Sequence, residues 1–193
     1  MAREYDRRNL DFILKEVFDT ASLCNYPRYA DYTPDMFDMV LDSADAIAEK
    51  YLRPIYVDSD RKAAELVDGV VHVHPGIEPY IKEMGESGMI GCTFDIEHGG
   101  QQVPSMIGGA HEFIRGAAHN SAVMFTGLSH GAAHLIASFG SKELADTYVP
   151  NMLSGKWTGT MCLTESHAGS DLGIIRTKAE PQADGSYAIT GEK

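Results

Sequence analysis

The sequence predicts a mainly α-helical domain followed by the first strands of an incomplete β domain. Apolar residues recur at helical spacing through most of the chain, whereas from Trp157 onward they alternate with polar residues at a period of two. Two long segments between residues 104 and 139 carry very few charges, as is typical of central helices that are packed on most sides. We therefore expect a helical domain over residues 1–155 and the beginning of a β domain over residues 156–193.

Two amphipathic helices are expected near the N-terminus. The second has Thr33 as N-cap, Pro34 at its first position and Asp35 in its first turn, and Pro54 ends it. The first is predicted from one apolar stripe with helical spacing: Leu10, Ile13, Leu14, Val17, Phe18 and Ala21.

Residues 57–76 are expected to form a connector that contains a short hairpin turning at Asp68-Gly69. A short helix then spans residues 77–86 and closes at Ser87-Gly88. A glycine-rich loop at residues 97–104 precedes two helices near 104–119 and 121–139. A last helix begins at Ser141 as its cap and runs to about Tyr148.

Three strands are expected after Gly155. They cover residues 157–164, 177–180 and 186–190, and the last two are joined by a turn at Asp184-Gly185. Because a sheet of so few strands is rarely stable alone, we expect residues 1–193 to be a piece of a longer protein.

Composition excludes several classes of partner. The 193 residues carry a formal net charge of −12, which disfavours binding to nucleic acid and to anionic membranes. Residues 116–141 lack Asp, Glu, Lys and Arg and could span a bilayer by length, but their scattered polar side chains favour a buried helix, so no membrane span is expected. The cysteines, Cys24, Cys92 and Cys162, show no paired spacing, and no secretory signal is visible, so a cytoplasmic protein with reduced thiols is expected.

Histidine pairs are the first candidates for a functional site. His130 and His134 lie four residues apart, as a metal pair on a helix would, but no third ligand is evident. We interpret them as interior histidines hydrogen-bonded to neighbours, and we interpret His72 and His74 in the same way. No metal site is therefore predicted.

Residues 161–173 are the stronger candidate, since a strand end opens there into a loop rich in Thr, Ser and Gly. The hydroxyls of Thr164, Ser166 and Ser170 and exposed backbone N–H groups suit the edge of a heteroaromatic ring and a pyrophosphate. The residues alone equally allow a simple capping loop, with Ser170 and Asp171 as cap residues.

The motifs of the chain resemble those of the acyl-CoA dehydrogenase family. The core of the resemblance is the TE-x-x-AGSD motif at residues 164–171, within the run SGKWTGTMCLTESHAGSDLGIIRTKAEPQADGSYAITGEK. Upstream segments fit in the same order: DGVVHVHPGIEPYIKEMGESGMIG, EHGGQQVP and SHGAAHLIASFGSKELADTYVPNMLSG. The N-terminal REYDRRNLDFILKEVFD and the tryptophan in KWTGTMCLTE resemble a longer-chain subfamily that includes 3-methylmercaptopropionyl-CoA dehydrogenases.

This resemblance implies an FAD-dependent oxidoreductase with a helical, a β and a second helical domain. In such enzymes a carboxylate base removes a proton from Cα of an acyl-CoA while hydride passes from Cβ to flavin N5. The family's base lies in its C-terminal helical domain, so no catalytic residue is assigned in this chain. The resemblance also implies an acyl-CoA substrate, electron-transfer flavoprotein as acceptor, and a homo-oligomer when the protein is full length.

The resemblance assigns cofactor binding to Met161, Leu163, Thr164, Gly169 and Ser170. The first three match positions that face the flavin ring, and the other two match the turn near the ribityl-pyrophosphate. Ser170 is also the residue expected to touch the substrate. Cys162 is expected to point to the other face and pack. One departure is Glu165-Ser166, where the family has Glu-Pro.

Three interpretations of function follow. In the first, the chain is the N-terminal part of an acyl-CoA dehydrogenase and is inactive as this fragment. The second is a short, non-catalytic relative that acts as an oligomerisation or binding module, and the third is an acyl-CoA oxidase.

Overall fold

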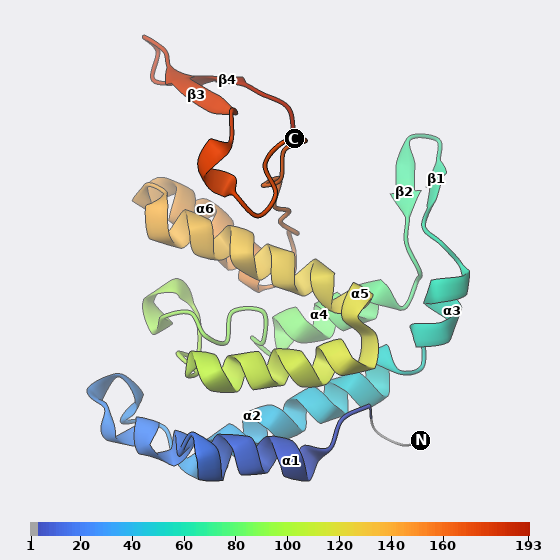
Figure 1. Cartoon of the computed structure of the whole chain (residues 1–193), viewed down its shortest axis with the longest axis vertical. Helices are drawn as coiled ribbons and strands as arrows, with labels where there is room; N and C mark the ends of the chain where they lie inside the picture. The colour runs from blue at the N-terminus through green and yellow to red at the C-terminus, as the bar shows by residue number, and fades with distance from the viewer. Residues whose placement is uncertain (1–3) are drawn as a thin grey trace. The chain divides into compact units, whose positions relative to one another are not determined.

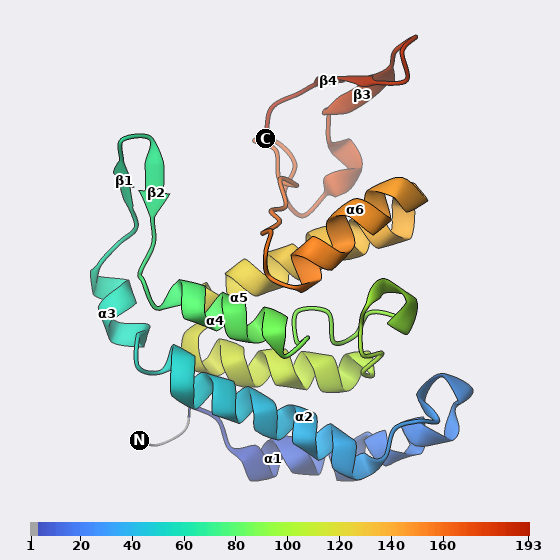
Figure 2. The same ribbon diagram turned by 180° about the vertical axis from the view of Figure 1, so that it is seen from behind.

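The structure, a computed structural model, describes residues 4–193 (Figures 1 and 2). The chain forms two compact units, Met1–Gly159 and Thr160–Lys193, and each is described by itself. The first unit is helical and the second contains short strands, which confirms the predicted fold class.

The first helix, α1 (Arg7–Phe12), begins at Asp6, whose carboxylate accepts hydrogen bonds from the backbone N–H groups of Arg8 and Asn9. It continues as the π-helical turn η1 (Ile13–Val17). The predicted apolar stripe is longer than the helix, because Asp19 takes a left-handed conformation with φ of 45° and ends it. The 3₁₀ segments η2 (Thr20–Asn25) and η3 (Pro27–Tyr29) follow, so the prediction of a helix reaching Ala21 is wrong.

The second helix, α2 (Pro34–Ile47), confirms the predicted start with Thr33 at the N-cap, although the Thr33 side chain makes no capping hydrogen bond. It extends as the π-helical turn η4 (Ala48–Leu52) and stops before Pro54, as predicted. One apolar face of this helix is buried as far as Ala48, as its amphipathic pattern predicts: Phe37, Val40, Leu41, Ala44, Ile47 and Ala48.

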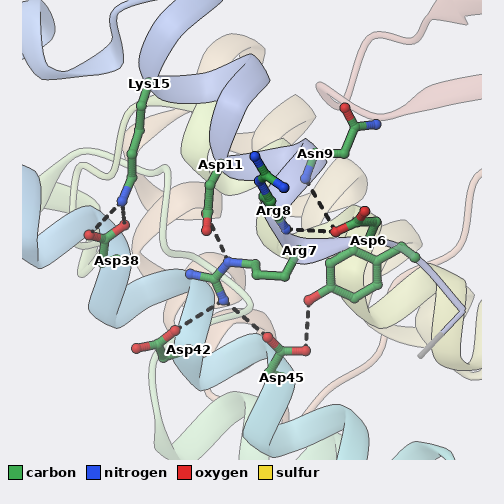
Figure 3. A network of polar contacts seen from close by, with 10 residues as sticks. Asp6, Arg7, Arg8, Asn9, Asp11, Lys15, Asp38, Asp42 and Asp45 are labelled. Atoms are coloured by element: carbon green, nitrogen blue, oxygen red, sulfur yellow. Dashed lines mark hydrogen bonds and ion pairs between the residues drawn. The ribbon is translucent and has the colours of Figure 1, made fainter. Parts of the chain in front are cut away.

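A polar network fastens α1 to α2 (Figure 3). Arg7 donates from Nε to Asp11 at 2.9 Å and from Nη1 to Asp42 and Asp45, each at 3.0 Å. The Tyr5 hydroxyl donates to the other oxygen of Asp45 at 2.7 Å. Asp45 is buried, and the Arg7 guanidinium compensates part of its charge.

The connector contains one helix that the sequence pattern did not predict, α3 (Tyr56–Arg61). The predicted hairpin is confirmed: β1 (Glu65–Val67) pairs antiparallel with β2 (Val70–His72). Asp68 and Gly69 both have positive φ at its turn, as two-residue hairpin turns require. Both strands are exposed, and both views show the hairpin extending away from the helices of its unit (Figures 1 and 2).

The helix α4 (Ile77–Glu86) has the predicted bounds, and Gly88 with φ of 71° ends the turn after it. The glycine-rich loop contains the 3₁₀ segment η5 (Ile96–His98). The long helix α5 (Ser105–Phe139) follows and is interrupted at His119, whose φ of −166° and ψ of 84° are not helical. The prediction of two successive helices with a boundary near residue 120 is therefore confirmed.

The interruption in α5 is held by hydrogen bonds of the His119 ring. Its Nδ1 accepts from the backbone N–H of Ala122, at 3.4 Å, so the proton of the neutral ring lies on Nε2. Nε2 in turn lies 2.8 Å from the hydroxyl of Ser59 in α3.

None of the helices in the described part of the chain has the length and hydropathy that a bilayer span requires.

The last helix, α6 (Lys142–Leu153), starts as predicted, with the Ser141 hydroxyl accepting from the backbone N–H of Leu144. It does not end near Tyr148 but continues through Pro150. Pro150 has no backbone N–H, so the helical hydrogen bond to the carbonyl of Asp146 is lost. Because Asp146 is exposed, water can bind this carbonyl instead.

Two apolar clusters form the core of the helical unit. One joins η1 and α2 to the first half of α5, through residues such as Leu14, Leu41 and Ile114. The other joins η4, α4 and α6 to the second half of α5, through residues such as Tyr80 and Val123. The two halves of α5 thus organise both clusters.

The second unit contains the 3₁₀ segment η6 (Leu172–Ile174) and a hairpin of β3 (Lys178–Pro181) and β4 (Tyr187–Thr190), with Gly185 at φ of 84° in its turn. These two strands confirm the predicted hairpin.

Residues 157–164 do not form the predicted strand. A strand requires a hydrogen-bonded neighbour, and no described residue pairs with this segment.

The network of Figure 3 yields a test of the α1–α2 contact. Replacing Arg7 with Met keeps the apolar stem but removes the guanidinium from the carboxylates of Asp11, Asp42 and the buried Asp45. We expect Arg7→Met to lower the free energy of unfolding by about 1–2 kcal/mol, measured by urea denaturation. The matched control is Arg8→Met, because Arg8 is exposed and should tolerate the same change within about 0.5 kcal/mol. Equal losses in the two variants would contradict this role of Arg7.

Candidate functional site

The candidate site is the loop that begins at Met161. Met161 and Leu163 are each 44% exposed, although both side chains are apolar, and the Thr164 side chain is also exposed. Cys162 is exposed as well, so the expectation that it packs is wrong. The reason is the missing strand, since without pleating the side chains do not alternate between a buried and an open face.

A tight turn follows at residues 165–168. The backbone N–H of Ala168 donates to the carbonyl of Glu165 at 3.1 Å, and the N–H of Glu165 donates to the carbonyl of Ala168 at 2.9 Å. Ser166 occupies the second position of this turn, where the fixed φ of proline is also compatible. The turn explains why Glu-Ser can stand where the resemblance expects Glu-Pro.

The Glu165 carboxylate is the centre of this unit. Its side chain is only 3% exposed, and its two oxygens accept hydrogen bonds from the backbone N–H groups of Arg176, at 2.8 Å, and Thr177, at 3.0 Å. The Lys193 ammonium lies 3.0 Å from it and also donates to the carbonyl of Leu163. Glu165 therefore ties the loop to the segment that leads into β3.

These donors favour the charged form of Glu165. The backbone N–H groups of Thr177 and Arg176 and the Lys193 ammonium hold the pKa of the Glu165 carboxyl well below its usual range. The carboxylate is thus ionised at neutral pH and fully engaged in holding the loop, so it is not free to act on a bound molecule.

The second half of the loop is open. An added Cβ at Gly169 would meet no atom of the chain within 4 Å, and Ser170 is exposed. Asp171 accepts from the backbone N–H of Gly173 at 3.1 Å and caps η6. The capping role considered for Asp171 is therefore present, and it leaves Gly169 and Ser170 accessible.

The five predicted cofactor-binding residues thus lie on one loop whose exposed face carries apolar side chains, hydroxyls and a glycine. This composition fits a flat ring with polar edges, because Met161 and Leu163 offer uncovered apolar surface and Thr164 and Ser170 offer hydroxyls. Sequence reasoning missed Glu165. Its only signal was an acidic residue, one of two in the motif with Asp171, among hydroxyl and glycine residues.

The histidine pairs do not form a site of this kind. His130 Nδ1 lies 2.8 Å from the carbonyl of Ile90, and His134 is exposed with Nδ1 3.4 Å from the Ser138 hydroxyl. His74 lies 3.0 Å from Asp58. These contacts confirm that His130, His134 and His74 are hydrogen-bonded to neighbours, but His134 and His72 are exposed, so the expectation of interior side chains is wrong for these two. Within residues 4–193, no group of three or more His, Cys, Asp or Glu side chains is placed to hold a metal ion.

Comparison with known families gives a match to the acyl-CoA dehydrogenase N-terminal domain over residues 34–156. The chain is 33% identical over 163 residues to 3-methylmercaptopropionyl-CoA dehydrogenase of Ruegeria pomeroyi, covering 81% of this chain and 28% of that protein. It is 31% identical to a butyryl-CoA dehydrogenase of Syntrophomonas wolfei, covering 98% of this chain and 32% of that protein. The chain therefore spans about a third of the length of these relatives.

Solved structures share the fold. An acyl-CoA dehydrogenase of Bacillus anthracis complexed with FAD aligns with a TM-score of 0.66 at 22% identity. The alignment covers 83% of this chain and 27% of that one.

The role of Glu165 can be tested with Glu165→Gln. The amide group of glutamine replaces one acceptor oxygen by a donor and removes the charge, so it cannot accept from both Arg176 and Thr177 and pair with Lys193. We expect amide hydrogen exchange at Arg176 and Thr177 to become faster. The matched control is Glu180→Gln, because Glu180 is an exposed residue of β3 and should leave these amides protected.

The same contacts predict a pH dependence. Folding lowers the pKa of Glu165 from its usual value of 4.5, so the ionised carboxylate stabilises the folded state. This contribution to the free energy of unfolding is fully present above about pH 4.5 and is lost progressively as the pH falls below that value. Protection of the Arg176 and Thr177 amides should therefore decrease below pH 4.5 in the natural sequence and change less in Glu165→Gln. Identical profiles for the two proteins would refute this role of the carboxylate.

Proposed function

The chain belongs to the acyl-CoA dehydrogenase family, and we propose that it is the N-terminal part of an FAD-dependent enzyme that desaturates an acyl-CoA between Cα and Cβ. In this proposal residues 1–155 are the N-terminal helical domain and residues 156–193 begin the flavin-binding β domain. The match over residues 34–156 supports the extent of the helical domain. By itself the chain is expected to be inactive.

The observation that carries the proposal is the exposed loop around Glu165. We assign cofactor binding to Met161, Leu163, Thr164, Gly169 and Ser170. The two apolar side chains would cover the ring and keep water from it, and the Thr164 hydroxyl would hydrogen-bond to its polar edge. Gly169 does not have a positive φ, and a Cβ at this position would meet no atom of the chain within 4 Å, so the fold itself does not require glycine here. A glycine would, however, allow a bound group to approach the backbone closely.

FAD, when bound, supplies the hydride acceptor. The work of this chain would be positional: Ser170 contacts the substrate, and Glu165 acts as a positioning residue that holds the loop through Arg176 and Thr177. We assign no residue of this chain as the base that takes the Cα proton. That base would come from the enzyme beyond these residues.

We also propose a cytoplasmic enzyme that works as a homo-oligomer and passes its electrons to electron-transfer flavoprotein. Large apolar side chains on α5, such as Phe113, Leu135 and Phe139, are exposed and would be covered by other parts of such an assembly. The three cysteines are unpaired, as in proteins of a reducing compartment.

The proposal predicts that Thr164 contributes to FAD affinity. Thr164→Val keeps the shape of the side chain and removes the hydroxyl. We expect the whole enzyme to bind FAD about 5–10-fold more weakly, as measured by quenching of flavin fluorescence. The matched control is Thr190→Val, because Thr190 is an exposed residue of β4 outside the loop. Unchanged FAD affinity in Thr164→Val would count against the assignment of this loop.

A further inference from the structure

The segment of residues 56–73, which contains α3, β1 and β2 (Figure 1), is attached to the helical unit without a buried side chain. None of its residues belongs to either apolar cluster. Two side-chain hydrogen bonds connect it to other parts of the unit: Ser59 contacts His119 in α5, and Asp58 contacts His74 before α4. Both bonds involve a histidine ring, whose nitrogens change their hydrogen-bonding roles on protonation.

A cavity of about 260 Å³ lies between α3 and the start of the second half of α5. Tyr56, Ser59 and Asp60 of α3 line it. Two buried apolar residues line it as well, Ile77 at the start of α4 and Ala122 in α5. All lining residues belong to Met1–Gly159. A movement of α3 away from α5 would therefore open this cavity to solvent.

The His119 ring makes two hydrogen bonds of opposite sense. Its Nδ1 accepts from the Ala122 N–H at 3.4 Å, and its Nε2 donates to the Ser59 hydroxyl at 2.8 Å. That hydroxyl donates in turn to the carbonyl of Tyr56, at 3.1 Å, so it acts as an acceptor towards His119. Only a neutral ring can accept at one nitrogen and donate at the other.

Protonation of His119 would disrupt this arrangement. A proton on Nδ1 would point at the Ala122 N–H, so that two donors face each other. His119 is only 5% exposed, so the charged ring would also lack hydration. The charged form is therefore favoured where the ring turns away from Ala122 and reaches water, and this turn breaks the bond to Ser59.

The charged groups around the ring leave this cost in place. Burial, together with His74, lowers the pKa of His119 from its usual value of 6.5, although Asp60 acts in the opposite direction. Lys62 also lines the cavity, whereas the lining residues of α4 and α5 other than His119 are uncharged: Ile77, Ser121, Ala122 and Phe125. The neutral ring therefore stabilises the closed position fully above about pH 6.5 and progressively less below that value.

The second histidine responds differently. His74 Nδ1 accepts from the Gly76 N–H at 3.1 Å, so the ring proton lies on Nε2, which is 3.0 Å from the Asp58 carboxylate. Protonation of His74 keeps this donor and adds a charge to it. The contact between His74 and Asp58 is therefore retained at lower pH.

We propose that His119 is a proton-operated latch: its neutral ring holds α3 against α5, and its protonation releases α3 and opens the cavity between them. The Asp58–His74 contact keeps α3 and the hairpin tethered beside α4 during this movement. The latch lies wholly within the helical unit and does not depend on flavin binding.

Amide hydrogen exchange of the 193-residue chain tests the latch. The N–H groups of Ser59 and Lys62 donate to the carbonyls of Ile55 and Asp58 and so report on α3. Because a six-residue helix is marginal without tertiary contacts, its release should also loosen these bonds. After correction for intrinsic exchange rates, their protection should fall at least about threefold from about pH 7.5 to about pH 5.5.

His119→Asn removes the titrating group. The asparagine oxygen can still accept from the Ala122 N–H, as an N-cap side chain does, but it takes up no proton in this pH range. We expect the protection of Ser59 and Lys62 to become independent of pH in this variant. The matched control is His72→Asn, because His72 is an exposed residue of β2 and its loss should leave the pH dependence intact.

Three outcomes would overturn the latch: constant protection of α3 in the natural chain, a pH dependence that persists in His119→Asn, or one that His72→Asn abolishes equally. If His119→Asn does not fold, an NMR titration of the natural chain decides. The His119 ring should then take up its proton below about pH 6.5, over the same range in which α3 loses protection. Proton uptake over a different range from the loss of protection would contradict the proposal.

Discussion

The helical unit depends on the interruption of α5 at His119 and on the buried guanidinium of Arg115 one turn before it. Arg115 contacts His111 on its own half of α5, Thr126 on the other half and Tyr80 on α4. One side chain therefore links three helical segments across the interruption. The two apolar clusters lie mainly on the two halves of α5, which this contact joins.

The second unit is organised by the opposite charge. The Glu165 carboxylate is as buried as Arg115, but it receives backbone N–H groups and the Lys193 ammonium, so its charge is compensated within the unit. Compensation within its unit makes Glu165 a structural centre, whereas Arg115 is held by hydrogen bonds to uncharged partners on two other helical segments and its own.

Local signals in the sequence predicted the elements whose ends are set by local chemistry. Pro34 and Ser141 start α2 and α6, and the Asp68-Gly69 pair makes the hairpin turn. The failures have tertiary or backbone causes. Asp19 adopts a left-handed conformation that the apolar stripe does not reveal, and Pro150 is accepted in the last turn of α6, where only one helical donor is lost.

At the candidate site, too, local features could be predicted from the sequence and tertiary contacts could not. The residue types of the loop and its turn were visible in the sequence, but the role of Glu165 was not, since its partners lie eleven and twelve residues further along the chain. Residues 157–164 have the alternation of a strand without a described partner, and pairing is not encoded in one segment alone.

The central claim is that these residues belong to a flavin-dependent acyl-CoA dehydrogenase. Its most direct test is anaerobic addition of butyryl-CoA to the purified whole enzyme while the visible absorbance of the flavin is recorded. The account predicts a yellow protein whose flavin absorbance is bleached by the thioester but not by free butyrate, because only the thioester carbonyl stabilises charge as the Cα proton leaves. A whole protein that binds no flavin, or a flavin that no acyl-CoA of any chain length bleaches, would contradict it.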